Sequence, residues 1–106
     1  MSTTIMSGQA VTQDPSDVRT YVIDWGASAL DAGVLIVTSS FQVHRMYGSG
    51  SLSLANATIV SGARKTSLVI SGGYLGGPYL VSNKITTSES PSQTLERSFT
   101  VRVADL

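Results

Sequence analysis

Few residues of this sequence could carry out chemistry. Histidine occurs once, as His44, and there is no cysteine, so disulfide bonds and thiolate metal sites are excluded. A zinc ion needs three or four ligands, and His44 has no second histidine or cysteine to share one with it. The aspartates of the first third of the chain have no spacing typical of paired catalytic carboxylates; they are Asp14, Asp17, Asp24 and Asp31. We therefore predict no catalytic residue, no metal ligand and no cofactor-binding residue, and we expect that the protein is not an enzyme.

The composition indicates which kinds of partner the protein does not bind. The 106 residues include seven basic and seven acidic side chains, so the net charge is zero. Such a balance is not typical of a protein that binds nucleic acid or an anionic membrane. Residues 1–13 have neither a basic start nor an apolar run long enough for a signal peptide or a membrane span. We expect no nucleic-acid, membrane or small-molecule partner, and a single domain with one core.

A long hairpin near the C-terminus is the most clearly patterned element. Apolar and polar side chains alternate over residues 79–87 and again over residues 95–103, as in half-buried strands. The polar residues 88–92 between them include a proline, which favours a turn. A turn centred on Ser90 predicts one register, in which one face is apolar and opposite charges meet on the other. The predicted pairs are Ile85–Leu95, Val81–Phe99, Tyr79–Val101, Lys84–Glu96 and Asn83–Arg97.

Further strands precede this hairpin. Residues 18–25 place Tyr21, Ile23 and Trp25 on one face, and we expect Trp25, the only tryptophan, to anchor the core. Asp24 is predicted to be a turn or cap residue. Residues 26–33 are predicted to form a loop from which Leu30 points inward. Residues 34–43 are rich in β-branched side chains, and the expected inward set is Leu35, Val37, Ser39, Phe41 and Val43.

Two more strand patterns, over residues 52–60 and 65–70, complete the set. Six to seven strands joined by short turns, without an amphipathic helix, predict an all-β fold. Among all-β folds they favour an antiparallel immunoglobulin-like β-sandwich over a closed barrel. We assign this sandwich domain to residues 18–106.

Residues 1–17 are predicted to be an extended N-terminal arm. Asp14 and Pro15 favour a turn at its end, because an aspartate side chain can bind nearby amides and proline fixes φ. The arm is either a frayed terminus or a segment that orders on an adjacent subunit. In the second interpretation Ile5, Met6 and Val11 contact that subunit.

A glycine-rich stretch, residues 71–78, precedes the hairpin. Its two Gly-Gly pairs allow positive φ and tight turns. It is either a simple strand connection or a place where another subunit approaches closely, with Tyr74 and Leu75 as contacts at the tip. Tyr47, in another predicted loop, is a further candidate for the interface.

The order of several short motifs resembles a known family. The motifs are Asp24-Trp25, Thr38-Ser39-Ser40, Ile70-Ser71-Gly72-Gly73, residues 82–87 (SNKITT) and residues 97–103 (RSFTVRV). In this order the chain is similar to bacteriophage fibre-tail adaptors, which are small structural proteins of the virion. The longer middle of this chain and its N-terminal extension depart from the family pattern.

The resemblance implies a function that composition alone does not reveal. It implies a tail adaptor that joins the phage tail to fibres or neighbouring tail rings, through loop, edge and arm contacts. The implied partners are other tail or fibre proteins and further copies of the chain in a ring, with no cofactor. The implied location is the tail of a virion assembled in the host cytoplasm.

Two other functions stay open. The same scaffold could be a head decoration or head-to-tail connector protein, which only its position in the virion distinguishes from a tail adaptor. It could also be a carbohydrate-binding module, in which exposed Tyr47, Tyr74 and Tyr79 stack on sugar rings.

Overall fold

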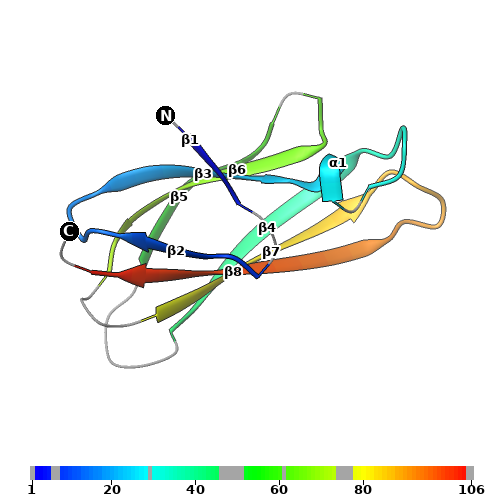
Figure 1. The fold of residues 1–106 in the computed structure, drawn as a ribbon. Coiled ribbons are helices and arrows are strands. Elements are labelled where there is room, and N and C mark those ends of the chain that lie inside the picture. The colour runs from blue at the N-terminus through cyan, green and yellow to red at the C-terminus, as the bar shows by residue number, and fades with distance from the viewer. Residues whose placement is uncertain are drawn as a thin grey trace.

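The structure is a computed structural model that describes residues 2–5, 8–28, 30–45, 52–60, 62–73 and 78–104. In this part of the chain eight strands form two four-stranded sheets, and the only helix is a single turn (Figure 1). The elements are β1 (Ser2–Ile5), β2 (Ala10–Gln13), β3 (Val18–Asp24), α1 (Trp25–Ser28), β4 (Ile36–Arg45), β5 (Leu52–Ile59), β6 (Lys65–Gly72), β7 (Pro78–Thr87) and β8 (Thr94–Val103). The prediction of an all-β fold is confirmed.

Each sheet combines parallel and antiparallel pairs. The strand order is β1-β3-β6-β5 in one sheet and β2-β8-β7-β4 in the other. The pairs β1–β3 and β2–β8 are parallel, and the remaining pairs are antiparallel. This corrects the prediction of an antiparallel sandwich of six to seven strands, and the immunoglobulin-like topology is not confirmed. The two additional strands are the four-residue β1 and β2, which are too short to show an alternation that identifies a strand.

The residues expected to form an N-terminal arm are part of both sheets. They form β1 beside β3 and β2 beside β8, so the sheets include residues that precede position 18. The predicted turn that follows β2 is present: the Ser16 amide donates to Asp14 Oδ1 at 2.8 Å, and the Asp17 amide donates to the Asp14 carbonyl at 2.9 Å.

The register of the β7–β8 hairpin is confirmed. All five predicted pairs are present, including Val81 with Phe99 and Lys84 with Glu96. The side chains of β7 alternate between the core and the outer face, and Tyr79, Val81 and Ile85 share the buried parity. The alternation and the polar turn therefore specify one pairing.

Strand β4 corrects the expected inward set at its start. The register with β7 shifts between Ile36 and Thr38, so Val37 is the extra residue of a β-bulge. Ile36 is buried, whereas Leu35 and Val37 are 41% and 57% exposed. After the bulge the predicted parity holds, and Phe41 packs against the core. The bulge was not predicted because this strand is β-branched or apolar at both parities near its start.

The core lies between the sheets. Trp25 is 0% exposed, as predicted, and Leu30, in the loop after α1, is buried as predicted. The rings of Tyr21 on β3 and Phe99 on β8 lie 5.8 Å apart, which joins one sheet to the other. No helix within the described ranges is long and apolar enough to cross a membrane.

Candidate interaction surfaces

A buried polar network around Asn83 connects the two sheets. Trp25 Nε1 donates to Asn83 Oδ1 at 2.9 Å and to Thr66 Oγ1 at 3.2 Å, and Thr66 Oγ1 donates to the same Asn83 oxygen at 2.7 Å. Asn83 Nδ2 donates to Ser39 Oγ and to the Ser40 carbonyl, both at 2.9 Å. Asn83 is 0% exposed. Its amide makes four hydrogen bonds, so it pays no desolvation penalty for unpaired polar atoms.

The residues beside Trp25 hold the same region together. The guanidinium of Arg97 lies 5.5 Å from the centroid of the Trp25 ring, within the range of a cation–π interaction. Asp24 accepts a hydrogen bond from the Ala27 amide at 3.1 Å, which confirms its predicted role as a cap. Its other carboxylate oxygen lies 4.0 Å from Lys65 Nζ.

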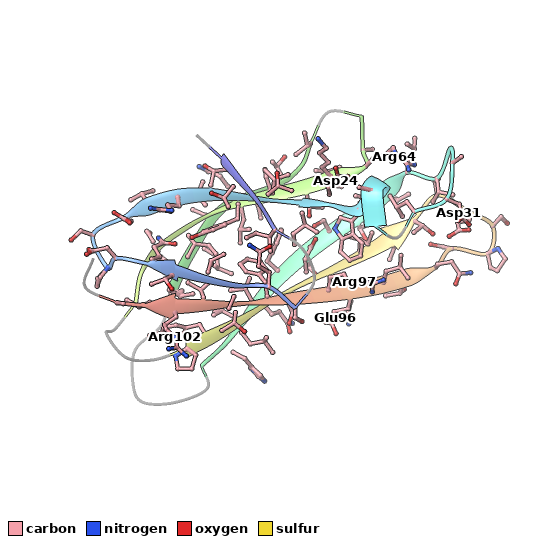
Figure 2. The ribbon with its side chains drawn as sticks, viewed as in Figure 1. Asp24, Asp31, Arg64, Glu96, Arg97 and Arg102 are labelled. Atoms are coloured by element: carbon pink, nitrogen blue, oxygen red, sulfur yellow. The ribbon has the colours of Figure 1, made fainter. Side chains whose placement is uncertain are left out.

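Arg64 fixes the loop that follows α1. Its guanidinium donates to the carbonyls of Gly26, Leu30, Asp31 and Val34, at distances from 2.6 to 3.4 Å. Figure 2 shows Arg64 and Asp24 on either side of this helical turn. A single side chain thus binds the carbonyl of Gly26 in α1 and three carbonyls of the loop that follows it.

The turn after β6 requires glycine. Gly72 and Gly73 have φ values of 75° and 95°, a region that other residues rarely adopt. A Cβ atom on Gly73 would lie 2.8 Å from both Leu52 Cδ2 and Val103 Cγ2. The predicted positive φ is therefore confirmed for this Gly-Gly pair, and close packing against the core adds a second reason for glycine at position 73.

Four of the five motifs that carry the sequence resemblance thus meet around Asn83. Trp25, Ser39, Ser40, Asn83 and Arg97 belong to one cluster, although they come from four separate segments of the sequence. In comparison with known families, residues 13–102 match the family described as podophage GP4 fiber-tail adaptor protein gp77. The chain belongs to this family. No curated protein matches the chain.

The family match confirms the resemblance predicted from the sequence motifs, and it indicates a structural function. Fibre-tail adaptors are structural proteins of phages, which is not a class of enzyme. The cluster around Asn83 has the character of a structural element, since its side chains are occupied with one another. The sequence motifs therefore mark how the adaptor is built, and its contacts with other proteins must lie on the surface.

A second buried network joins β2 to the opposite sheet. Tyr21 Oη donates to Gln13 Oε1 at 2.8 Å, and Gln13 Nε2 donates to the carbonyls of Ile70 at 2.8 Å and Asp17 at 3.1 Å. Burial raises the pKa of the Tyr21 hydroxyl above its ordinary value of 10.0, an effect that Arg19 opposes and Asp17 reinforces. This network was not predicted, because a glutamine in a polar N-terminal stretch that also contains Gln9 has no distinguishing pattern.

The outer face of the β2-β8-β7-β4 sheet has a shallow hollow of about 240 Å³. Among the described residues it is lined by Gln42, His44, Ser82 and Glu96. His44 is exposed. Within the described ranges, no group of three histidine, cysteine, aspartate or glutamate side chains could hold a metal ion.

The predicted interface residues fall into two groups. Ile5 is 3% exposed and belongs to the core of its own chain, and Val11 packs against that core. Met6, Tyr47, Tyr74 and Leu75 lie outside the described residues. 

Tyr79 was a candidate for stacking on sugar rings. It is 1% exposed, so this part of the carbohydrate-binding hypothesis is wrong. The hairpin alternation that places Tyr79 opposite Val101 explains its burial.

The strands that flank the two predicted contact loops end on the same side of the fold. Arg45 pairs with Tyr79, and Leu52 pairs with Gly72, so β4 and β6 end, and β5 and β7 begin, at the end of the sandwich opposite α1 (Figure 1). Val18 pairs with Ser71 at this end and is 71% exposed. Val18 was not among the predicted contacts, although its parity in β3 is opposite to that of the buried Tyr21.

Proposed function

We propose that the protein is a structural adaptor of the phage tail that joins the tail to fibres or to neighbouring tail rings. The observation that carries this proposal is the family match over residues 13–102. The proposed partners are other tail and fibre proteins, together with further copies of the chain arranged in a ring. The proposed location is the tail of the virion, after assembly in the host cytoplasm.

The end of the sandwich opposite α1 is the proposed contact with the tail or fibre partner. Two predicted contact segments, with Tyr47 in one and Tyr74 and Leu75 in the other, connect strands that end there. The exposed Val18 supplies apolar surface at the same end. Tyrosine and apolar side chains are typical of the centres of protein interfaces.

The interior supports an adaptor that acts as a rigid body. Buried hydrogen-bonded networks join the sheets at Asn83 and at Gln13. An adaptor has to hold its two partners in a fixed geometry, and a body that deforms easily would not do so. This requirement needs no catalytic group.

The decisive experiment compares phage particles made with and without this chain. In particles that lack it, we expect tails without attached fibres, and in complete particles an electron-microscopy map should place the chain where tail and fibres meet. Fibres that attach normally without the chain would contradict the proposal. Density on the capsid lattice would instead support a head decoration protein, and density between head and tail would support a connector.

Two variants test the proposed contact end. Val18→Asp should reduce attachment of fibres or of the chain to the tail, whereas Thr94→Asp, an exposed substitution near the α1 end, should not. Both variants should keep the unfolding midpoint of the unmodified protein, which separates loss of contact from loss of fold. Equal attachment by the two variants would show that the contact does not lie at the end opposite α1.

A further inference from the structure

One outermost strand of each sheet lies at each side of the sandwich. The strand orders place β1 and β2 at one side, which we name the N-terminal side, and β4 and β5 at the other, which we name the β4/β5 side. Strands β4 and β5 approach each other across the two sheets. Each side therefore presents two outermost strands, one from each sheet, whose outer edges have no neighbouring strand within the described part of the chain.

Charge is distributed unevenly between outer and inner strands. Residues 2–5, 10–13, 36–44 and 52–59, which make up nearly all of the outermost strands, include no lysine, arginine, aspartate or glutamate. The inner strands are β3, β6, β7 and β8, and each of them carries at least one such residue. The charged residues of the inner strands are Arg19, Asp24, Lys65, Lys84, Glu96, Arg97 and Arg102.

This distribution is the reverse of what protects an exposed sheet edge. Proteins usually place lysine, other charges or proline on outermost strands, because unpaired backbone groups there can bind another chain. Two of the outermost strands here contain a bulge instead. The bulge of β4 is at Val37. In β5 the register with β6 shifts between Ala55 and Thr58, and Asn56 has a φ of 53°. From Thr38 to Arg45, however, β4 pairs with β7 without interruption, so its outer edge is regular over that length.

We propose that the β4/β5 side of one copy packs against the N-terminal side of the next, with β4 of one copy beside β2 of its neighbour. This inference deepens the proposed function and rests on it, since it assigns the surfaces through which copies would form the ring. The occupant is a second copy because the same chain supplies two sides that face in opposite directions and whose strands carry one charged residue, Arg45 at the end of β4. Contact between two such different sides is heterologous, and it produces a ring when the rotation from one copy to the next closes around an axis.

The geometry of the sheets suits this arrangement. In such a contact each sheet of one copy continues into the corresponding sheet of the next, because β4 and β2 end the same sheet, as do β5 and β1. The molecule measures 44 × 26 × 20 Å. A side of that length can supply the roughly 800 Å² that a standard interface buries from each partner. Pairing of one β4 with another β4 would leave the uncharged N-terminal side without an explanation.

The absence of cysteine allows a direct test by disulfide formation. Ser40 and Gln42 on β4, and Ala10 and Thr12 on β2, are exposed and are replaced singly by cysteine. Neighbouring strands bring Cα atoms within the distance that a disulfide spans. The control is Thr94→Cys, an equally exposed position on the inner strand β8. Oxidation is carried out on the purified protein at high concentration and on assembled phage tails.

We expect cross-links only between the β4/β5 side of one copy and the N-terminal side of another. A mixture of one β4 variant with one β2 variant should form a covalent dimer that contains one copy of each, and neither variant alone should exceed the Thr94→Cys control. The double variant Ser40→Cys/Thr12→Cys should form a ladder of larger multimers if these two positions lie opposite each other. Double variants that use Gln42→Cys or Ala10→Cys instead test the other possible registers between β4 and β2.

Three results would overturn the inference. Dimers of a β4 variant with itself would show pairing between like sides. Disulfides from β4 to a different virion protein would show that a partner occupies this edge. No cross-link above the control in tails that contain the chain would show that copies do not meet there. These failures differ from failure of the proposed function, in which the chain is absent from the junction of tail and fibres.

Discussion

The two buried polar networks fasten different parts of the fold. The Asn83 network joins β6 of one sheet and β7 and β4 of the other to the turn that carries Trp25, through segments that contain family motifs. The Gln13 network attaches the short outer strand β2 to the opposite sheet. Loss of the first should therefore weaken the whole domain, whereas loss of the second should first release the N-terminal segment. This contrast predicts global unfolding in one case and local opening in the other.

Replacement of Asn83 should have the largest effect. Asn83→Ala removes four hydrogen bonds and leaves the buried Trp25 indole and the partly buried Ser40 carbonyl with fewer partners. We expect a loss of about 3 kcal/mol in the free energy of unfolding, measured by denaturant titration. The loss should appear equally in probes of β2 and of β7.

The control for this prediction is the neighbouring, exposed Lys84. Lys84→Ala should change the free energy of unfolding by less than about 0.5 kcal/mol. Asn83→Asp retains the shape and the acceptor oxygen but loses the donors to Ser39 and Ser40, so it tests the donor half of the network. A loss below about 1 kcal/mol for both Asn83 variants would contradict the structural role of the cluster.

Replacement of Gln13 should have a smaller effect. Gln13→Ala removes the partner of the Tyr21 hydroxyl and both donors to backbone carbonyls. We expect a loss of about 2 kcal/mol and faster hydrogen exchange confined to β2 and its neighbourhood. Thr12→Ala, an exposed change on the same strand, is the control. Unchanged exchange in β2 would show that pairing with β8 alone retains the strand.

Removal of the Tyr21 hydroxyl should cost less again. Tyr21→Phe retains the ring contact with Phe99 but leaves Gln13 Oε1 without this donor. We expect a loss of about 1 kcal/mol at neutral pH, measured by denaturant titration. A loss as large as that of Gln13→Ala would mean that the hydroxyl, and not the amide, anchors β2.

The same variant tests the pH dependence. Burial raises the pKa of Tyr21 in the folded protein above the ordinary 10.0. Its contribution to stability is therefore fully present below pH 10 and decreases as the pH rises through the folded pKa, because the unfolded chain loses the proton first. One such group can lower the free energy of unfolding by at most about 1.4 kcal/mol per pH unit. Tyr21→Phe should make the decline above pH 10 less steep than in the unmodified protein.

The predictability of the fold followed the length of each pattern. The β7–β8 register could be predicted because ten-residue strands alternate clearly and a polar turn separates them. Strands β1 and β2 could not, since each has only four residues and pairs in parallel with a strand that does not follow it directly in the sequence. The bulge at Val37 was also missed, because apolar residues on both parities allow either face to point inward.

The candidate surfaces were less predictable than the fold. The alternation of the hairpin predicted Tyr79 on its apolar face, whereas the carbohydrate-binding hypothesis required an exposed Tyr79. Its burial contradicts the second prediction. The family motifs indicated function through resemblance, yet four of the five meet around Asn83. The uneven charge of outer and inner strands needed the strand order, because no residue of β2 or β4 is unusual until its position in the sheet is known.

The smallest expected effect is the coupling between the two networks. The strand β8 passes both of them: Arg97 pairs with Asn83, and Val103 pairs with Gln13. Six residues of strand separate these positions by about 20 Å, and no hydrogen bond described above is shared between the networks. The double variant Gln13→Ala/Asn83→Ala should therefore lose the sum of the single losses within about 0.5 kcal/mol. A larger deviation, measured in the same denaturant titrations, would mean that the N-terminal segment and the inner strands are fastened as one unit, and the contrast between local and global opening would then fail.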